Sequence, residues 1–262
     1  MSSQSLSQDT VRQAAEILIG ASVFFLAAAG VSFLIVKALR YEPFEDRGVM
    51  MVVMTAVNTG FMGFPITKAI FGDHFFFLMV IQNIILNIYL YFGAILQMNY
   101  GHRKKTGLMD VIRPLLNNNT YALLIGLAIL ITGFQMPSTL FEFFDTIANA
   151  TIPVSMIVVG IQLAGSDLKK VFKDHKLMIA CLANVVLMPI LTFLAVNWLP
   201  LMNESKLILV FASCFPCAVI STAMAAKEGK NASLVAEGVA VTTLFSMATL
   251  PAAAMILMEL YL

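Results

Sequence analysis

Apolar residues along this chain gather into eight long runs separated by short polar or charged stretches. The runs cover residues 17–39, 48–71, 75–98, 121–134, 146–165, 177–199, 207–225 and 234–257. Most reach the length of about 20 residues that a membrane-spanning helix needs, and the fourth does so only with residues 118–120 and 135–136 added. None alternates apolar and polar residues with a period of two, so the pattern predicts helices rather than the strands of a membrane barrel.

Composition indicates that these helices lie in a lipid bilayer. Of 262 residues, 60% are hydrophobic and 12% are charged, whereas a soluble domain carries about 25% charged residues. The net charge of +1, without a clustered basic patch, argues against a nucleic-acid partner. We therefore predict an all-α polytopic membrane protein with about eight transmembrane helices.

Lysine and arginine are divided unevenly between the two sides of the predicted bundle. Thirteen of the 16 follow the first, third, fifth and seventh runs, and Arg12, Lys68 and Lys206 lie on the other side. Because cytoplasmic loops carry an excess of these residues, the loops at 99–113 and 166–176 are predicted to be cytoplasmic. Both termini are then predicted to lie on the outer, non-cytoplasmic side of a plasma or inner membrane.

Two runs contain a proline with small or polar residues in mid-span. The second is broken at residues 58–65 (NTGFMGFP) and the seventh at residues 213–217 (SCFPC). Because the two runs are five apart, they cross the membrane in opposite directions. Such pairs are typical of inverted-topology repeats, in which discontinuous helices cross near the midplane and form the binding site. An ordinary proline kink is the alternative for either break alone.

The crossed breaks predict a division into two repeats. Residues 117–262 form a second repeat of five helices, and residues 1–116 form a first repeat of three, which is incomplete. A complete first repeat would have two further helices ahead of residue 17. The pattern leaves open whether the chain is shortened at its start, whether eight helices suffice, or whether an oligomer supplies the rest.

The chemistry of the breaks predicts an anion site. Proline in a helix removes a backbone donor, and irregular backbone at membrane depth is tolerated only against protein or a wet cavity. Pro65 suits the first position of the half-helix that follows, and Pro216 is expected to act in the same way from the opposite direction. Two half-helix N-termini then direct free N–H groups at one place, which favours an anion without a buried Lys or Arg.

The candidate binding residues gather around these breaks. Asn83 and Asn87 are four residues apart and share a helix face, where they serve either a substrate path or interhelical hydrogen bonds. The predicted substrate-binding set is Asn58, Thr59, Gly60, Gly63, Pro65, Asn83, Asn87, Ser213, Pro216 and Ile220. No catalytic residue, metal site or cofactor is predicted, because the three histidines are isolated in loops. The CxxC spacing at 214–217 lies in an apolar span and is interpreted as adventitious.

Short motifs resemble the auxin efflux carrier family. They are NTG and MGFP in the second run with KAIFGD at 68–73, NNNTY at 117–121 with IGL at 125–127, AKE at 226–228 and LP at 250–251. The resemblance runs from about residue 5 to the C-terminus. It implies ten helices in two inverted five-helix repeats, of which the absent pair would be the first two, and a homodimer. It also implies small organic acids, such as indole-3-acetate, malate or malonate, as substrates.

The sequence therefore predicts an efflux carrier of small organic anions, not an enzyme, that works by alternating access of a moving bundle against a scaffold. A transport-inactive ligand sensor or regulatory subunit of the same fold is the alternative, and a passive anion channel is the third reading. The first run has no titratable residue between Glu16 and Lys37. Glu237 and Lys68 are the nearest candidates for coupling, whereas uniport driven by the membrane potential needs none.

Overall fold

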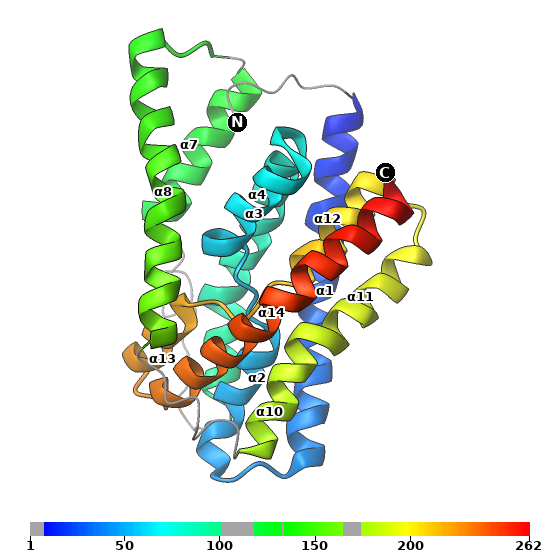
Figure 1. The fold of residues 1–262 in the computed structure, drawn as a ribbon, viewed down its shortest axis with the longest axis vertical. Coiled ribbons are helices and arrows are strands. Elements are labelled where there is room, and N and C mark those ends of the chain that lie inside the picture. The colour runs from blue at the N-terminus through cyan, green and yellow to red at the C-terminus, as the bar shows by residue number, and fades with distance from the viewer. Residues whose placement is uncertain (1–7, 101–117, 133, 165–173) are drawn as a thin grey trace.

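The computed structural model describes residues 8–100, 118–132, 134–164 and 174–262, and within these ranges the regular elements are helices (Figure 1). Among the described residues, five helices are long and apolar enough to cross a membrane. They are Gln8–Leu39, Asp73–Met98, Ser138–Ile161, His175–Asn197 and Ala232–Tyr261. The prediction of an all-α polytopic membrane protein is confirmed.

Each of the eight apolar runs corresponds to a helix or a broken helix. The first run forms α1 (Gln8–Leu39). The second forms α2 (Arg47–Thr55), a π turn (Thr59–Gly63) and α3 (Phe64–Phe71). The third forms α4 (Asp73–Ile88), a π turn (Tyr89–Ala94) and α5 (Ile95–Met98). The fourth and fifth runs form α7 (Asn118–Thr132) and α8 (Ser138–Ala164). The sixth run forms α10 (His175–Leu182), a π turn (Ala183–Leu187) and α11 (Met188–Asn197). The seventh forms α12 (Asn203–Ser213) and α13 (Ile220–Lys227), and the eighth forms α14 (Ala232–Tyr261).

The helix α8 begins eight residues earlier than the apolar pattern predicts. Its first turn forms directly after Pro137, whose carbonyl accepts a hydrogen bond from the Phe141 N–H (3.0 Å). The predicted start at residue 146 followed Glu142 and Asp145, which mark where apolar character begins. Charged residues end the hydrophobic part of a span, but they do not end the helix, because a helix can continue into water.

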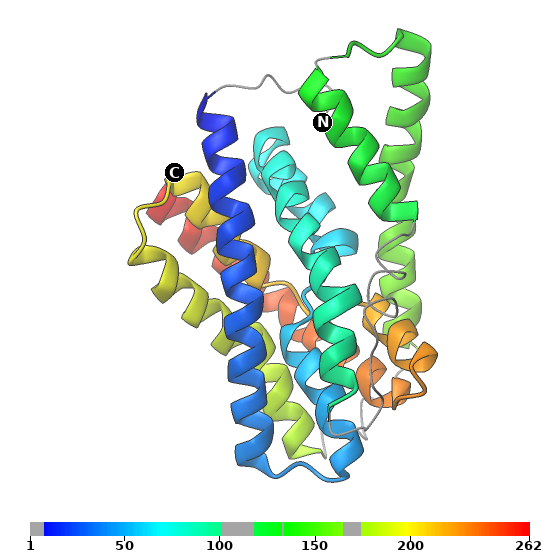
Figure 2. The same cartoon turned by 180° about the vertical axis from the view of Figure 1, so that it is seen from behind.

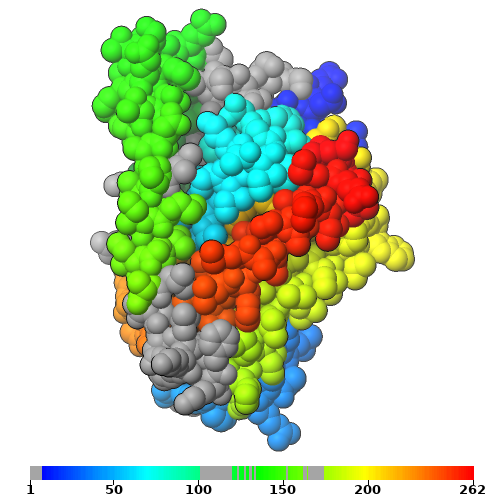
Figure 3. All heavy atoms as spheres, viewed as in Figure 1, coloured from blue at the N-terminus to red at the C-terminus, as the bar shows by residue number. Residues whose placement is uncertain are grey.

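The helices divide into two parts, which Figures 1 and 2 show from opposite sides. Helices α1–α5 and α10–α14 pack against one another, and we call them the body. Helix α2 is at the centre of the body, and all but the first of its residues are buried. Helices α7 and α8 form a hairpin along one side, drawn green in Figure 3, and α8 contacts the body at the π turn Thr59–Gly63 and at α14.

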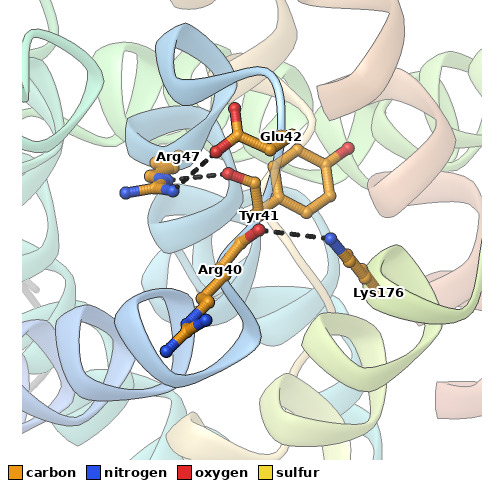
Figure 4. Close-up of polar contacts among 5 residues, drawn as sticks. All are labelled: Arg40, Tyr41, Glu42, Arg47 and Lys176. Atoms are coloured by element: carbon orange, nitrogen blue, oxygen red, sulfur yellow. Dashed lines mark hydrogen bonds and ion pairs between the residues drawn. The ribbon is translucent and has the colours of Figure 1, made fainter.

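The body is tied together at its predicted cytoplasmic end by the turn between α1 and α2 (Figure 4). Lys176, at the start of α10, donates to the Arg40 carbonyl (3.2 Å). Arg47 donates to the Tyr41 carbonyl (2.7 Å) and pairs with Glu42 (3.0 Å). These contacts join three helices of the body at points where the chain leaves the apolar span.

Candidate substrate site

The two broken helices cross where their backbones unwind. Residues 56–58 connect α2 to the first half-helix, and residues 214–219 connect α12 to α13. Val57 and Cys217 form an antiparallel bridge. The Asn58 N–H donates to the Pro216 carbonyl and the Ala218 N–H donates to the Ala56 carbonyl, each at 2.8 Å. Backbone groups freed by unwinding therefore satisfy one another, which makes irregular backbone tolerable at this depth.

The structure corrects the predicted extent of the breaks and the role of the prolines. The first half-helix already begins at Thr59, with a π turn in which the Gly63 N–H donates to the Asn58 carbonyl (3.1 Å). Pro65 therefore lies in the first turn of α3 and does not open the half-helix. The prediction that Pro216 opens the second half-helix is wrong, because α13 begins at Ile220. Pro216 suits the extended crossing because the bridge uses its carbonyl and needs no N–H from it.

Two buried side chains from neighbouring helices support the crossing. Thr242 on α14 accepts a hydrogen bond from the Cys217 N–H (3.1 Å). Asn184, in the π turn before α11, donates to the Met54 carbonyl at the end of α2 (3.1 Å). Both side chains are fully buried. Sequence reasoning did not single out Thr242, because a threonine in an apolar helix usually bonds only to its own backbone.

Replacing Thr242 with Val should lower stability, because the Cys217 N–H would lose its acceptor in an apolar environment. The expected cost is about 1–3 kcal/mol, seen as a lower Tm of the purified protein in detergent. Thr242→Ser keeps the hydroxyl and should melt close to the wild type. Equal Tm values for the two variants would show that the Thr242 hydroxyl does not support the crossing.

A cavity of about 470 Å³ lies beside the crossing, between the body and the hairpin. This volume is typical of small-molecule sites, which measure about 300–1,000 Å³. Its lining comes from the two broken helices, from α4 with the π turn that follows it, and from the hairpin: Val57, Asn58, Gly60, Phe61, Phe64, Val80, Asn83, Leu86, Asn87, Leu90, Ala122, Thr151, Ala218 and Ile220. Half of the predicted set lies on this wall, namely Asn58, Gly60, Asn83, Asn87 and Ile220.

The asparagines of α4 form a hydrogen-bonded chain that reaches the crossing. Asn87 Nδ2 donates to Asn83 Oδ1 (2.8 Å), and Asn83 Nδ2 donates to Thr59 Oγ1 (3.0 Å). The prediction that Asn83 and Asn87 share a helix face is confirmed. This chain fixes the orientation of the Asn83 amide against the first half-helix, and Thr59 lies behind the cavity wall.

The wall offers donors without a formal charge. In the part of the chain that the structure describes, the N–H groups of Gly60 and Phe61 have no acceptor, as expected for the first turn of a helix. Asn58, which is 2% exposed, has a buried Nδ2 without a partner among the described residues. All described lining residues are neutral, so the positive end of the half-helix dipole is not offset by a carboxylate on this wall.

The remaining predicted residues lie outside the described lining and shape the backbone around it. Gly63 allows a close approach, because a Cβ there would lie 3.0 Å from the Thr59 Cβ and 3.5 Å from the Phe215 ring. Ser213 donates to the Val210 carbonyl of its own helix (2.6 Å). Pro65 and Pro216 have the backbone roles described above. Sequence reasoning missed the cavity contribution of Thr151, because its distance from the breaks along the chain gives no signal.

Crossed, broken helices beside a cavity in an all-helical membrane body are typical of membrane transporters. A family model described as "Membrane transport protein" matches residues 1–253, and the chain belongs to this family, which confirms the resemblance to auxin efflux carriers. The chain is also similar to an uncharacterized transporter of Methanocaldococcus jannaschii, with 23% identity over 212 residues. The match covers 78% of this chain and 66% of the relative, so the chain spans just under two thirds of the relative's length.

Proposed function

We propose that the protein carries small organic anions across a cell membrane by alternating access, with the substrate bound in the cavity beside the crossing. One observation carries the proposal: Gly60 and Phe61, whose N–H groups have no acceptor among the described residues, line a neutral cavity of small-molecule size. Helix N-termini bind anions through such N–H groups and through the helix dipole. The site therefore needs no buried Lys or Arg.

The rest of the wall suits a carboxylate attached to a small apolar body. The Asn58 amide, and the N–H of the Asn83 amide that does not bond to Thr59, lie beside the half-helix N-terminus and can donate to carboxylate oxygens. Asn87 orients Asn83 by donating to its backbone and side-chain oxygens. Leu86 and Leu90 line the same cavity and offer apolar contact. This division of polar and apolar contacts is common in small-molecule sites, where a few polar groups orient a ligand held by apolar packing.

The proposed movement is a displacement of the body against the hairpin. Two side-chain hydrogen bonds hold the body together at its predicted cytoplasmic end. Lys176 donates to the Arg40 carbonyl, and Asn231 donates to the Asp46 carboxylate (2.9 Å). At its other end, Glu16 on α1 accepts from the Met202 N–H before α12 (2.9 Å). A body held at both ends would move as a unit and carry the crossing past α8. In this proposal the hairpin belongs to the scaffold of a homodimer in the bilayer, as the family resemblance implies.

The function is tested by flux of labelled malonate, malate and indole-3-acetate in proteoliposomes under an imposed membrane potential. Efflux of an anion down the potential releases about 2.3 kcal/mol per charge per 100 mV. We expect saturable flux of at least one of these acids that changes with the potential. Binding without flux would favour a ligand sensor, non-saturating flux would favour a channel, and neither binding nor flux of any acid would contradict the proposed substrate class.

We further propose that both termini lie outside the cytoplasm. Trp198, at the end of the sixth run, is 89% exposed, and Glu45, after the first run, is exposed at the opposite end. In intact cells, a membrane-impermeant maleimide should label Trp198→Cys and should reach Glu45→Cys only after permeabilisation. The parent protein is the control, because its described cysteines are buried. The reverse labelling pattern would overturn this orientation.

A further inference from the structure

A serine on the hairpin hydrogen-bonds to a carbonyl on the body that lies four residues before a proline. Phe61 and Pro65 are four residues apart, the spacing of α-helical hydrogen bonds, and Pro65 has no N–H to donate at that spacing. Ser155 on α8 donates its hydroxyl to the Phe61 carbonyl at 3.0 Å. The hydroxyl therefore provides the interaction that Pro65 cannot make.

This contact lies at the boundary between the two parts of the molecule. Phe61 lines the cavity from the body, and Ser155 is 3% exposed, where a carbonyl without a donor is costly. Thr151 is one helical turn before Ser155, on the same face of α8, and lines the cavity from the hairpin. Pro153 lies between these two residues within α8. A shift of α8 that breaks the Ser155 bond would therefore also move part of the cavity wall.

We propose that the Ser155–Phe61 hydrogen bond is a latch that holds the hairpin and the body in the conformation described here. Ser155 is a positioning residue in this scheme, because it acts on the arrangement of the two parts and not on the substrate. The inference rests on the proposed function, since the movement that the latch restrains is the one that would expose the cavity alternately. Pro65 makes the latch possible, because it leaves the Phe61 carbonyl available to a group from another helix.

The latch is tested by a double-substitution cycle read out as a distance between the two parts. Spin labels are attached to Leu26→Cys on α1 and Ile161→Cys on α8, which are 76% and 68% exposed. Double electron–electron resonance then compares four backgrounds: wild type, Ser155→Ala, Pro65→Ala and both substitutions together. Ser155→Thr, which keeps a hydroxyl, is the matched control, and the protein without introduced cysteines reports background labelling.

We expect Ser155→Ala to raise the population of a second distance about fivefold, the change produced by losing one hydrogen bond of ordinary net strength. Ser155→Thr should restore the wild-type distribution. In the Pro65→Ala background the new N–H at position 65 supplies a donor from the same helix. Ser155→Ala should then cause no further change.

Two results would overturn the latch: an unchanged distance distribution in Ser155→Ala, or the same shift with and without Pro65. The second result would mean that Ser155 acts through ordinary packing. The distance measurement needs no transport, so it can fail independently of the flux assay. Suppose that no organic acid is carried, but that Ser155→Ala changes the distance only when Pro65 is present. The carrier proposal then fails, and the contact remains a conformational latch.

Discussion

Asn58→Asp is expected to abolish carriage of organic anions, with initial flux falling about 100-fold or more. The substitution keeps the shape of the side chain but replaces an amide donor on the cavity wall with a carboxylate. Repulsion between this carboxylate and an anionic substrate a few ångströms away is worth about 3 kcal/mol in a partly shielded environment, a factor of roughly 100. Flux of the best substrate in proteoliposomes measures the effect.

Folding should survive this substitution, which separates a binding defect from an unfolded protein. Asn58 is the residue before the π turn and its side chain makes no capping hydrogen bond that the substitution would remove, and this position favours Asp as much as Asn. Asn197→Asp is the matched control, because Asn197 lies at the end of α11 and its Oδ1, which accepts from Tyr261 (2.9 Å), remains an acceptor. Wild-type flux in Asn58→Asp would show that the anion does not bind at the crossing.

Gly48→Ala is expected to cause the largest loss of stability among the glycine substitutions. A Cβ at position 48 would lie 2.1 Å from the Gln97 carbonyl oxygen and 2.9 Å from that of Met98. Both atoms belong to backbone, so relief requires α2 and α5 to move apart. Overpacking of a fixed core costs about 1–3 kcal/mol, and occasionally more, which should exceed the gain of about 1 kcal/mol in helix propensity.

Thermal unfolding in detergent, followed by loss of the monodisperse size-exclusion peak, measures this prediction. Gly30→Ala on α1 is the control, because a Cβ there meets no atom within 4 Å. We expect Gly30→Ala to melt at or above the wild-type Tm and Gly48→Ala to melt well below it. Similar Tm values for the two variants would mean that α2 and α5 separate at little cost.

Much of the architecture was predictable because it depends on local hydrophobicity and on whether two spans are separated by an odd or an even number of crossings. A span must cover the hydrocarbon core with apolar residues, so the eight runs appear directly in the sequence. An odd separation between the two proline-containing runs makes them antiparallel, which is why the crossing could be inferred before its hydrogen bonds were known. The spacing of Asn83 and Asn87, about one helical turn, likewise placed both on one face of α4.

Other features were not predictable because they depend on which carbonyl and which donor meet across helices. The prolines indicated which helices are broken but not which residues unwind, because the unwound residues are those around the backbone bridge between Val57 and Cys217. The roles of Thr242 and Ser155 depend on distances between helices far apart in the sequence. No local pattern distinguishes these two hydroxyls from others that bond within their own helix.

The sequence by itself determined that this is a helical membrane protein with two oppositely directed, broken spans, because burial in lipid imposes length, composition and periodicity on each segment separately. It also placed polar amides at the depth of the first break. Only the tertiary structure decided that the two breaks pair by backbone hydrogen bonds, that five of the predicted residues surround one cavity, and that α8 reaches the Phe61 carbonyl. These outcomes depend on how separate helices pack, and packing joins residues whose sequence positions carry no common pattern.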